Sequence, residues 1–220
     1  MSSIEDAQKL VDKLTTSTKP NLTQLRAIAK AYGKNQETAD ELWMHGATSS
    51  RLLALLVLDL KAMNTRSIER MIADVESAAE QDQRQLCDWL IANVIMTKSA
   101  LKKEAMTWLS EQSAIKQRVF WSVPARTIKA ENQAPHTHVL EVLETRMVSA
   151  DAMVQETMNW CAAQIGIVDA GLRGRCIQLG ERLGLYQDYP VSKGCTSPYL
   201  PVWIESVVGK QALGNGGRSR

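Results

Sequence analysis

Asp88 is the residue of this chain whose setting could support chemistry. It lies in an apolar helical stretch, Leu86 to Val94, one turn after Arg84, and the i, i+4 spacing places both side chains on one helix face. One interpretation is a simple surface ion pair with Arg84. The other is a carboxylate on the wall of a groove, where it can stabilise a positive charge that develops on a sugar.

A basic segment follows Asp88 and supplies the cations that such a groove needs. Residues 98–129 carry seven bases against two acids, in a chain whose net charge is only +2. A solvated helix face is the alternative interpretation, but a stripe of this kind attracts phosphates. Arg118 faces the same groove as Asp88 if the helices stack regularly. The residues expected to bind DNA are Arg84, Lys102, Lys103, Lys116 and Arg118.

Other chemistry finds little support in the sequence. There is no Gly-x-Ser-x-Gly, phosphate-loop, dinucleotide-binding or His-Glu-x-x-His pattern. His136 and His138 lie two residues apart with no obvious third ligand, so we expect no metal and no cofactor. The four cysteines include no Cys-x-x-Cys and predict free, mostly buried thiols. The six tryptophans lie mostly on apolar helix stripes, which favours core packing over base stacking for at least four of them.

The elements that position these residues are helices throughout. Residues 39–60, ADELWMHGATSSRLLALLVLDL, predict a helical hairpin with a stop at Gly46, and similar capped pairs recur along most of the chain. The sequence therefore predicts an all-α, HEAT-like repeat array with a concave basic groove, as one domain over residues 1–208 with a flexible tail over 209–220. A first helix is expected near residues 4–14, and Thr65 is expected to cap a later helix. Pro124 should kink or end its helix. We expect a loop at 130–135 and irregular chain at 184–194.

Composition agrees with a globular protein outside the membrane. Apolar residues make up 45% and charged residues 23% of the 220 residues. The longest apolar run, Leu52 to Leu58, is too short to cross a bilayer, and the first nineteen residues have no signal-peptide pattern. We therefore expect a cytoplasmic protein with no membrane partner.

Three segments together resemble a known family. The hairpin contains Leu-Trp, a glycine turn and then Arg-Leu-Leu-Ala; the segment MNWCAAQIG contains Trp160; and Cys195-Thr196-Ser197-Pro198 lies near the C-terminus. These features resemble the bacterial DNA alkylation repair proteins with HEAT-like repeats, the AlkD-like DNA glycosylases. The resemblance covers roughly residues 21–207.

The resemblance implies a duplex DNA partner, alkylated or damaged, held on a basic concave face. In active members it also implies hydrolysis of the N-glycosidic bond of alkylated purines, with Asp88 at the catalytic carboxylate and Arg118 at a DNA-contacting arginine. An N-alkylated purine is already cationic and can leave without a general acid. Arg84, however, stands where active members carry a tryptophan that stacks against the lesion.

Two functions from different classes remain open on the sequence. One is an alkylpurine DNA glycosylase in which Asp88 stabilises the sugar cation and positions water. The other is a non-catalytic repeat protein that binds DNA structure, or a protein partner, through the same groove. Arg84 favours the second function, because a salt-bridged Asp88 is partly neutralised as a catalytic carboxylate.

Overall fold

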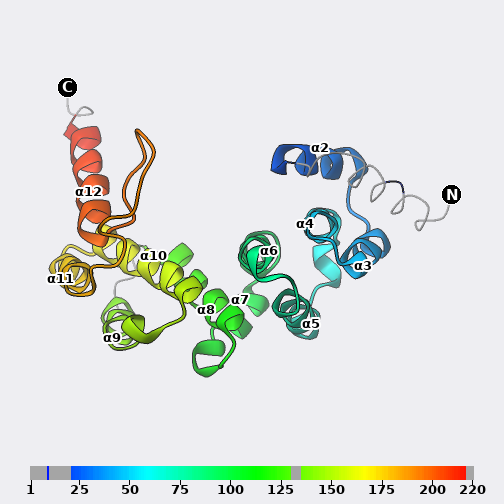
Figure 1. Ribbon diagram of the computed structural model, residues 1–220, viewed down its shortest axis with the longest axis horizontal. Coiled ribbons are helices and arrows are strands. Elements are labelled where there is room, and N and C mark those ends of the chain that lie inside the picture. The colour runs from blue at the N-terminus through cyan, green and yellow to red at the C-terminus, as the bar shows by residue number, and fades with distance from the viewer. Residues whose placement is uncertain (1–8, 10–20, 130–134, 217–220) are drawn as a thin grey trace. The chain divides into compact units, whose positions relative to one another are not determined.

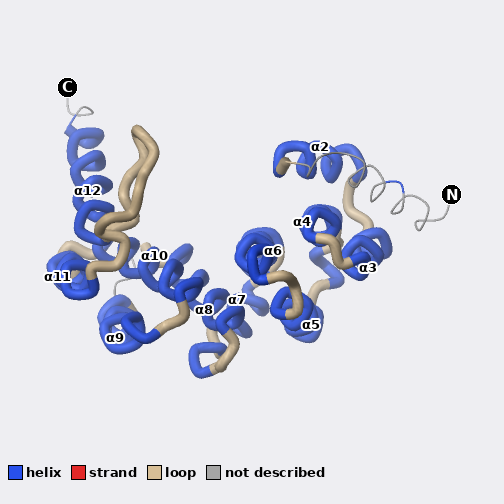
Figure 2. Tube along the Cα trace, in the orientation of Figure 1, coloured by secondary structure: helices blue, strands red, loops and turns tan. Residues whose placement is uncertain are grey.

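Helices form every regular element that the structure describes. The computed structural model describes residue 9 and residues 21–129 and 135–216, and in these parts of the chain there are eleven α-helices, four short 3-10 helices and no strand (Figure 1, Figure 2). The all-α prediction is confirmed. The helix expected near residues 4–14 lies outside the described residues, as does most of the loop expected at 130–135.

The chain divides into two compact units, Met1–Val119 and Phe120–Arg220, and the boundary falls inside helix α8. The first unit contains the hairpins expected from the sequence. Its helices are α2 (Leu22–Tyr32), α3 (Gln36–His45), α4 (Thr48–Val57), η1 (Leu60–Ala62), α5 (Thr65–Glu76), α6 (Glu80–Asn93), η2 (Ile95–Thr97), α7 (Ser99–Ala105), η3 (Trp108–Ser110) and the start of α8 (Ala114–Thr127).

Two helix layers make up the first unit. In one layer α4 packs against both α2 and α6, and in the other α5 packs against α7 (Figure 1). The hairpins α3/α4 and α5/α6 connect the layers, as expected for HEAT-like repeats. Gly46 makes the tight turn of the first hairpin, because its φ of 83° is a left-handed conformation that glycine adopts without steric cost.

Side-chain caps begin several of these helices, although not always at the predicted residue. Asn21 and Gln24 form a reciprocal capping box on α2, and Asn35 accepts the amide of Thr38 at the start of α3. Asn64 caps α5 in place of the expected Thr65, since its Oδ1 accepts the amide of Ser67. The cap is therefore one residue earlier than predicted, and the helix itself begins at Thr65.

The second unit contains five α-helices in its described residues, counting the end of α8. Pro124 was expected to kink or end its helix, and it lies inside α8 without ending it. The helix continues to Thr127, and the Ile128 amide donates to the Pro124 carbonyl. Helix α10 packs against α9, α11 and α12. These helices are α9 (His136–Arg146), η4 (Met147–Ser149), α10 (Ala152–Val168), α11 (Arg173–Leu183) and α12 (Leu200–Gly216).

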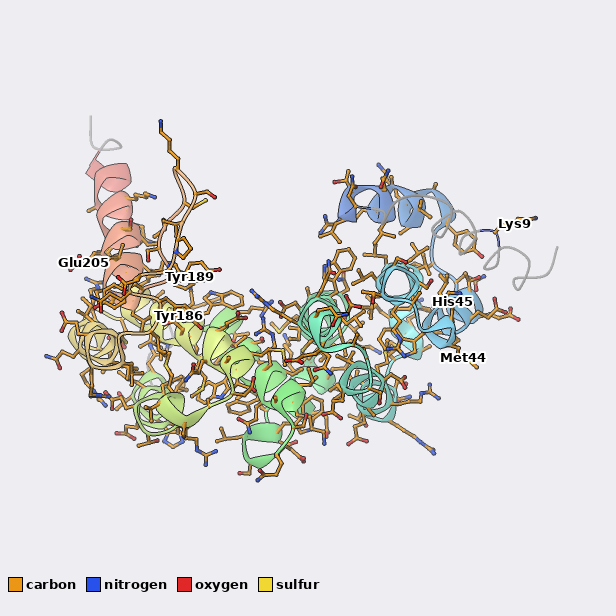
Figure 3. All side chains as sticks on the ribbon, viewed as in Figure 1. Lys9, Met44, His45, Tyr186, Tyr189 and Glu205 are labelled. Carbon is orange, nitrogen blue, oxygen red and sulfur yellow. The ribbon has the colours of Figure 1, made fainter. Side chains whose placement is uncertain are left out.

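The segment between α11 and α12 is irregular, as the sequence predicts. It begins at Gly184, whose φ of 63° is left-handed, and includes Tyr186, whose φ is 65°. Tyr186 and Tyr189 pack edge to face with ring centroids 6.0 Å apart (Figure 3). Helix α12 then continues to Gly216, past residue 208 where the domain was expected to end, and the division into one domain and a tail stays a prediction.

No helix in the described parts of the chain is both long enough and apolar enough to cross a membrane.

Candidate nucleic-acid interface

Helix α6 places Asp88 at the edge of its buried face. Glu80 and Asp82 in its first turn favour the helix N-terminus, where a negative charge interacts well with the helix dipole. Leu86, Cys87 and Leu90 are fully buried in the core. Asp88 lies between Cys87 and Leu90 in sequence, but its side chain remains 36% exposed, so its carboxylate lies where the core meets the surface.

Arg118 holds this carboxylate with both ends of its guanidinium. Arg118 Nε donates to Asp88 Oδ1 at 2.9 Å, and Nη2 donates to Oδ2 at 3.0 Å. This two-point geometry is the strongest form of an arginine–carboxylate pair. The arginine side chain is only 5% exposed, so it lies beneath Asp88. The structure thus brings Asp88 and Arg118 together as the sequence suggested, but through a direct ion pair.

Arg84 lies on the exposed surface of α6 one turn before Asp88, as the spacing predicts. The neighbour on the other side is Trp89, which is half-buried and lies under the guanidinium of Arg26 from α2, 5.2 Å from the ring centroid. This contact is a cation–π interaction, and it was not foreseen from the sequence. It links α2 to the helix that carries Asp88.

The other cations of the basic segment have different surroundings. Lys98 Nζ donates to the Met63 carbonyl at 2.7 Å, which stabilises the end of η1. Lys116 pairs with Glu111 at 3.3 Å and also lies 5.6 Å from the Trp108 ring centroid. Several cations of the basic segment, residues 98–129, therefore have partners within the protein.

Lys102 and Lys103 lie on α7, which packs against α5, whereas Asp88 is carried by α6 in the other layer. Lys102 is half-buried and Lys103 is exposed. The structure does not gather all five predicted DNA-binding residues at one point, and their contact with DNA stays a prediction.

Two motif residues of the α3/α4 hairpin have structural partners. Trp43 Nε1 donates to the Asp74 carboxylate at 2.7 Å. Arg51 lies 5.4 Å from the Trp43 ring centroid and donates through Nη1 to the Asp74 carbonyl at 2.9 Å. Tryptophan and arginine together attach the hairpin to α5.

The motif residues of the second unit also contact other parts of the fold. Trp160 lies under Arg126, whose guanidinium carbon is 4.5 Å from the ring centroid. Asn159 Nδ2 donates to the Pro198 carbonyl at 2.8 Å, which ties α10 to the irregular segment. The Asn-Trp and Thr-Ser-Pro motifs are therefore in contact through this bond.

The two histidines considered as metal ligands are in different surroundings. His136 is buried, and its Nδ1 lies 3.2 Å from Asp169 Oδ2, while Asp169 Oδ1 accepts the amides of Gly171 and Leu172. His138 is 82% exposed and lies 3.9 Å from Glu141. Among the described residues, no three metal-binding side chains gather at one place.

The cysteines are free, as predicted, and three of the four are buried. Burial raises the pKa of the Cys176 thiol to about 12, and burial likewise raises the pKa of Cys161 well above its ordinary value. Both thiols are therefore neutral core residues, and Cys195 is exposed.

Comparison with known proteins identifies the class and then the family. A solved structure has the same fold, with a TM-score of 0.66 over 96% of this chain and 89% of that chain at 18% identity. That protein is described as one of a new family related to the HEAT-like repeat DNA glycosylases with affinity for branched DNA structures. A comparison with curated proteins finds no significant match. The fold is thus a HEAT-like repeat array.

Residues 20–179 match the family described as DNA alkylation repair enzyme. This match covers most of the chain, and the protein belongs to that family. The resemblance inferred from the three motifs is confirmed.

Proposed function

We propose that this protein binds DNA and recognises DNA structure, branched DNA in particular, without cleaving a glycosidic bond. The observation that carries the proposal is the two-point pair between Arg118 and Asp88. Both carboxylate oxygens already accept strong hydrogen bonds from a guanidinium, so the negative charge that a sugar cation requires is largely compensated.

The position of Arg84 supports the same proposal. An arginine one turn before Asp88 adds a second cation where active members of the family carry an aromatic wall. A guanidinium repels a cationic base, whereas it attracts a phosphate. The surface around Asp88 therefore suits the DNA backbone better than an alkylated purine. The structural relative with affinity for branched DNA makes a junction the first substrate to test.

One observation favours an alkylpurine DNA glycosylase as the second candidate. The Asp88 side chain is 36% exposed, so a ligand can reach it, and a carboxylate has lone pairs beyond those that Arg118 uses. A cationic purine needs no general acid to leave, so one accessible carboxylate is a sufficient minimum for this chemistry.

Binding and excision are tested side by side. Affinity for a four-way junction is compared with affinity for a linear duplex of the same length and sequence, in titrations at several salt concentrations. Release of 7-methylguanine and 3-methyladenine from methylated duplex is followed under single-turnover conditions. We expect tighter binding to the junction, affinity that falls steeply with salt, and no released base.

The Asp88→Asn variant separates the two candidates, after its melting curve shows that it is folded at the assay temperature. Base release by the wild type that this variant abolishes would establish the glycosylase and overturn our proposal. Equal affinity for junction and duplex would refute structure recognition. An affinity that does not change with salt would refute binding through phosphates.

A further inference from the structure

Helix α2 carries a cationic surface, although bases and acids are nearly equal in number over the first eighty residues of the chain. From Asn21 to Gln36 there are three cations, Arg26, Lys30 and Lys34, and no acid. All three side chains belong to exposed residues. We call these three residues the α2 stripe.

The α2 stripe surrounds one recess. A shallow cavity of about 290 Å³ is lined by the three cations together with Ala29, Gly33 and Leu56, and no acid among the described residues lines it. Arg26 and Lys30 are four residues apart on α2, so their Cβ atoms are about 6 Å apart on one face. Lys34 follows Gly33, which ends the helix with a φ of 88°, and returns to the same recess from the loop.

Contacts within the protein hold two of these cations in place. Lys34 Nζ donates to the Leu56 carbonyl at 2.7 Å, and the Arg26 guanidinium lies over the Trp89 ring. Neither partner is an acid, so neither contact cancels the positive charge. Lys30 lies in the last turn of α2, where a cation also compensates the helix dipole, but Arg26 is in mid-helix and gains little there.

The position of the stripe in the fold relates it to the candidate interface. Helices α2 and α6 both pack against α4 and so belong to one layer of the first unit. Arg26 reaches Trp89, the residue next to Asp88, and Asp88 is bound by Arg118. The stripe therefore contacts the same helix, α6, that carries Asp88 of the Arg118–Asp88 pair.

We propose that the α2 stripe is a second DNA-binding site, which holds the phosphate backbone of a duplex. The inference rests on the proposed function and deepens it, since it adds a contact region at the N-terminal end of the interface. Two cations about 6 Å apart on one helix face can reach neighbouring phosphates of one strand. Such contacts supply affinity and salt dependence but no sequence preference.

The test compares two double variants, each of which removes two positive charges from the protein. Arg26→Gln with Lys30→Gln removes two cations from the α2 stripe and leaves Lys34 in its structural bond. Arg66→Gln with Arg70→Gln is the matched control, because Arg66 and Arg70 are also exposed and four residues apart, but on α5 in the other layer. Binding of a fluorescein-labelled duplex is measured by anisotropy over a range of salt concentrations, after circular dichroism confirms that both variants are folded.

We expect the α2 variant to bind duplex about tenfold more weakly at low salt, and its slope of log affinity against log salt to fall by about two, one unit for each lost phosphate contact. The α5 variant should change affinity by less than about twofold, since its cations lie on a helix of the other layer.

Failure of this inference is distinguishable from failure of the proposed function. If the wild type binds duplex with a steep salt slope and the α2 variant behaves like the α5 variant, the α2 stripe is not a DNA-binding site and the proposed function stands. That result would also follow if the stripe bound an acidic protein instead. If the wild type has no salt-dependent DNA affinity, the proposed function fails and this inference fails with it.

Discussion

The Arg118–Asp88 pair predicts an asymmetric response to substitution. Its two members differ in exposure, because the Arg118 side chain is 5% exposed and the Asp88 side chain is 36% exposed. Asp88→Asn leaves a positive charge in the core with a weaker acceptor, whereas Arg118→Met leaves a carboxylate that water can reach. Removal of the exposed partner should therefore destabilise the protein more than removal of the buried partner.

The magnitudes follow from the same exposures. Breaking a fully buried pair costs about 3 to 5 kcal/mol, and since Asp88 is about a third exposed we expect about 2 kcal/mol for Asp88→Asn. Arg118→Met should cost about 1 kcal/mol, because the remaining carboxylate is partly hydrated and the methionine fills part of the space. The double variant should also cost about 1 kcal/mol, since it leaves no uncompensated charge. The resulting coupling between the two residues is about 2 kcal/mol.

Urea denaturation followed by tryptophan fluorescence measures these free energies of unfolding for the wild type, both single variants and the double variant. Equal slopes against urea concentration in all four proteins are the control, because they show that the substitutions change stability and not the unfolded state. A greater loss of stability from Arg118→Met than from Asp88→Asn would refute the argument from exposure. So would a coupling below about 0.5 kcal/mol.

Three further predictions test the surrounding fold. Gly180→Ala should lower the free energy of unfolding by about 1 to 3 kcal/mol in urea denaturation, because its Cβ would lie 2.5 Å from Leu200 Cβ, while Gly174→Ala in the same helix meets no atom within 4 Å and should be neutral or stabilising. A thiol reagent should label Cys195 rapidly and the other three cysteines only on unfolding, as counted by mass spectrometry. Trp43→Phe should cost about 1 kcal/mol of unfolding free energy, since it removes the hydrogen bond to Asp74.

Much of the fold could be predicted because it depends on local patterns. Apolar spacing of three and four residues identified the helices, and Gly46 marked the hairpin turn at the observed place. Local patterns were not sufficient where a neighbouring side chain or tertiary packing determines where a helix begins or ends. Asn64 competes with Thr65 for the same cap, and both residue types suit it. Pro124 is accommodated inside α8 although proline in mid-helix normally costs about 3 kcal/mol.

The candidate site was less predictable, because its contacts join residues far apart in the chain. Spacing could suggest that Arg84 and Asp88 share a face, but the partner that holds both carboxylate oxygens is Arg118, thirty positions away. The structure adds a contact with Asp88 to the predicted role of this arginine, and its contact with DNA stays a prediction. The contact of Arg26 with Trp89 has a similar origin, since α2 and α6 meet only because both pack against α4.

The sign of the local charge connects these observations to function. Arg118 is bound to the Asp88 carboxylate, and Arg84 lies one helical turn away. The three side chains together carry a net positive charge, because they include two cations and one anion. A sugar cation or a cationic purine is stabilised only where the net field is negative. A phosphate is stabilised where the net field is positive. On the proposed function, an arginine at position 84 would oppose excision of a cationic base and favour binding to the DNA backbone, so a single substitution would produce both effects.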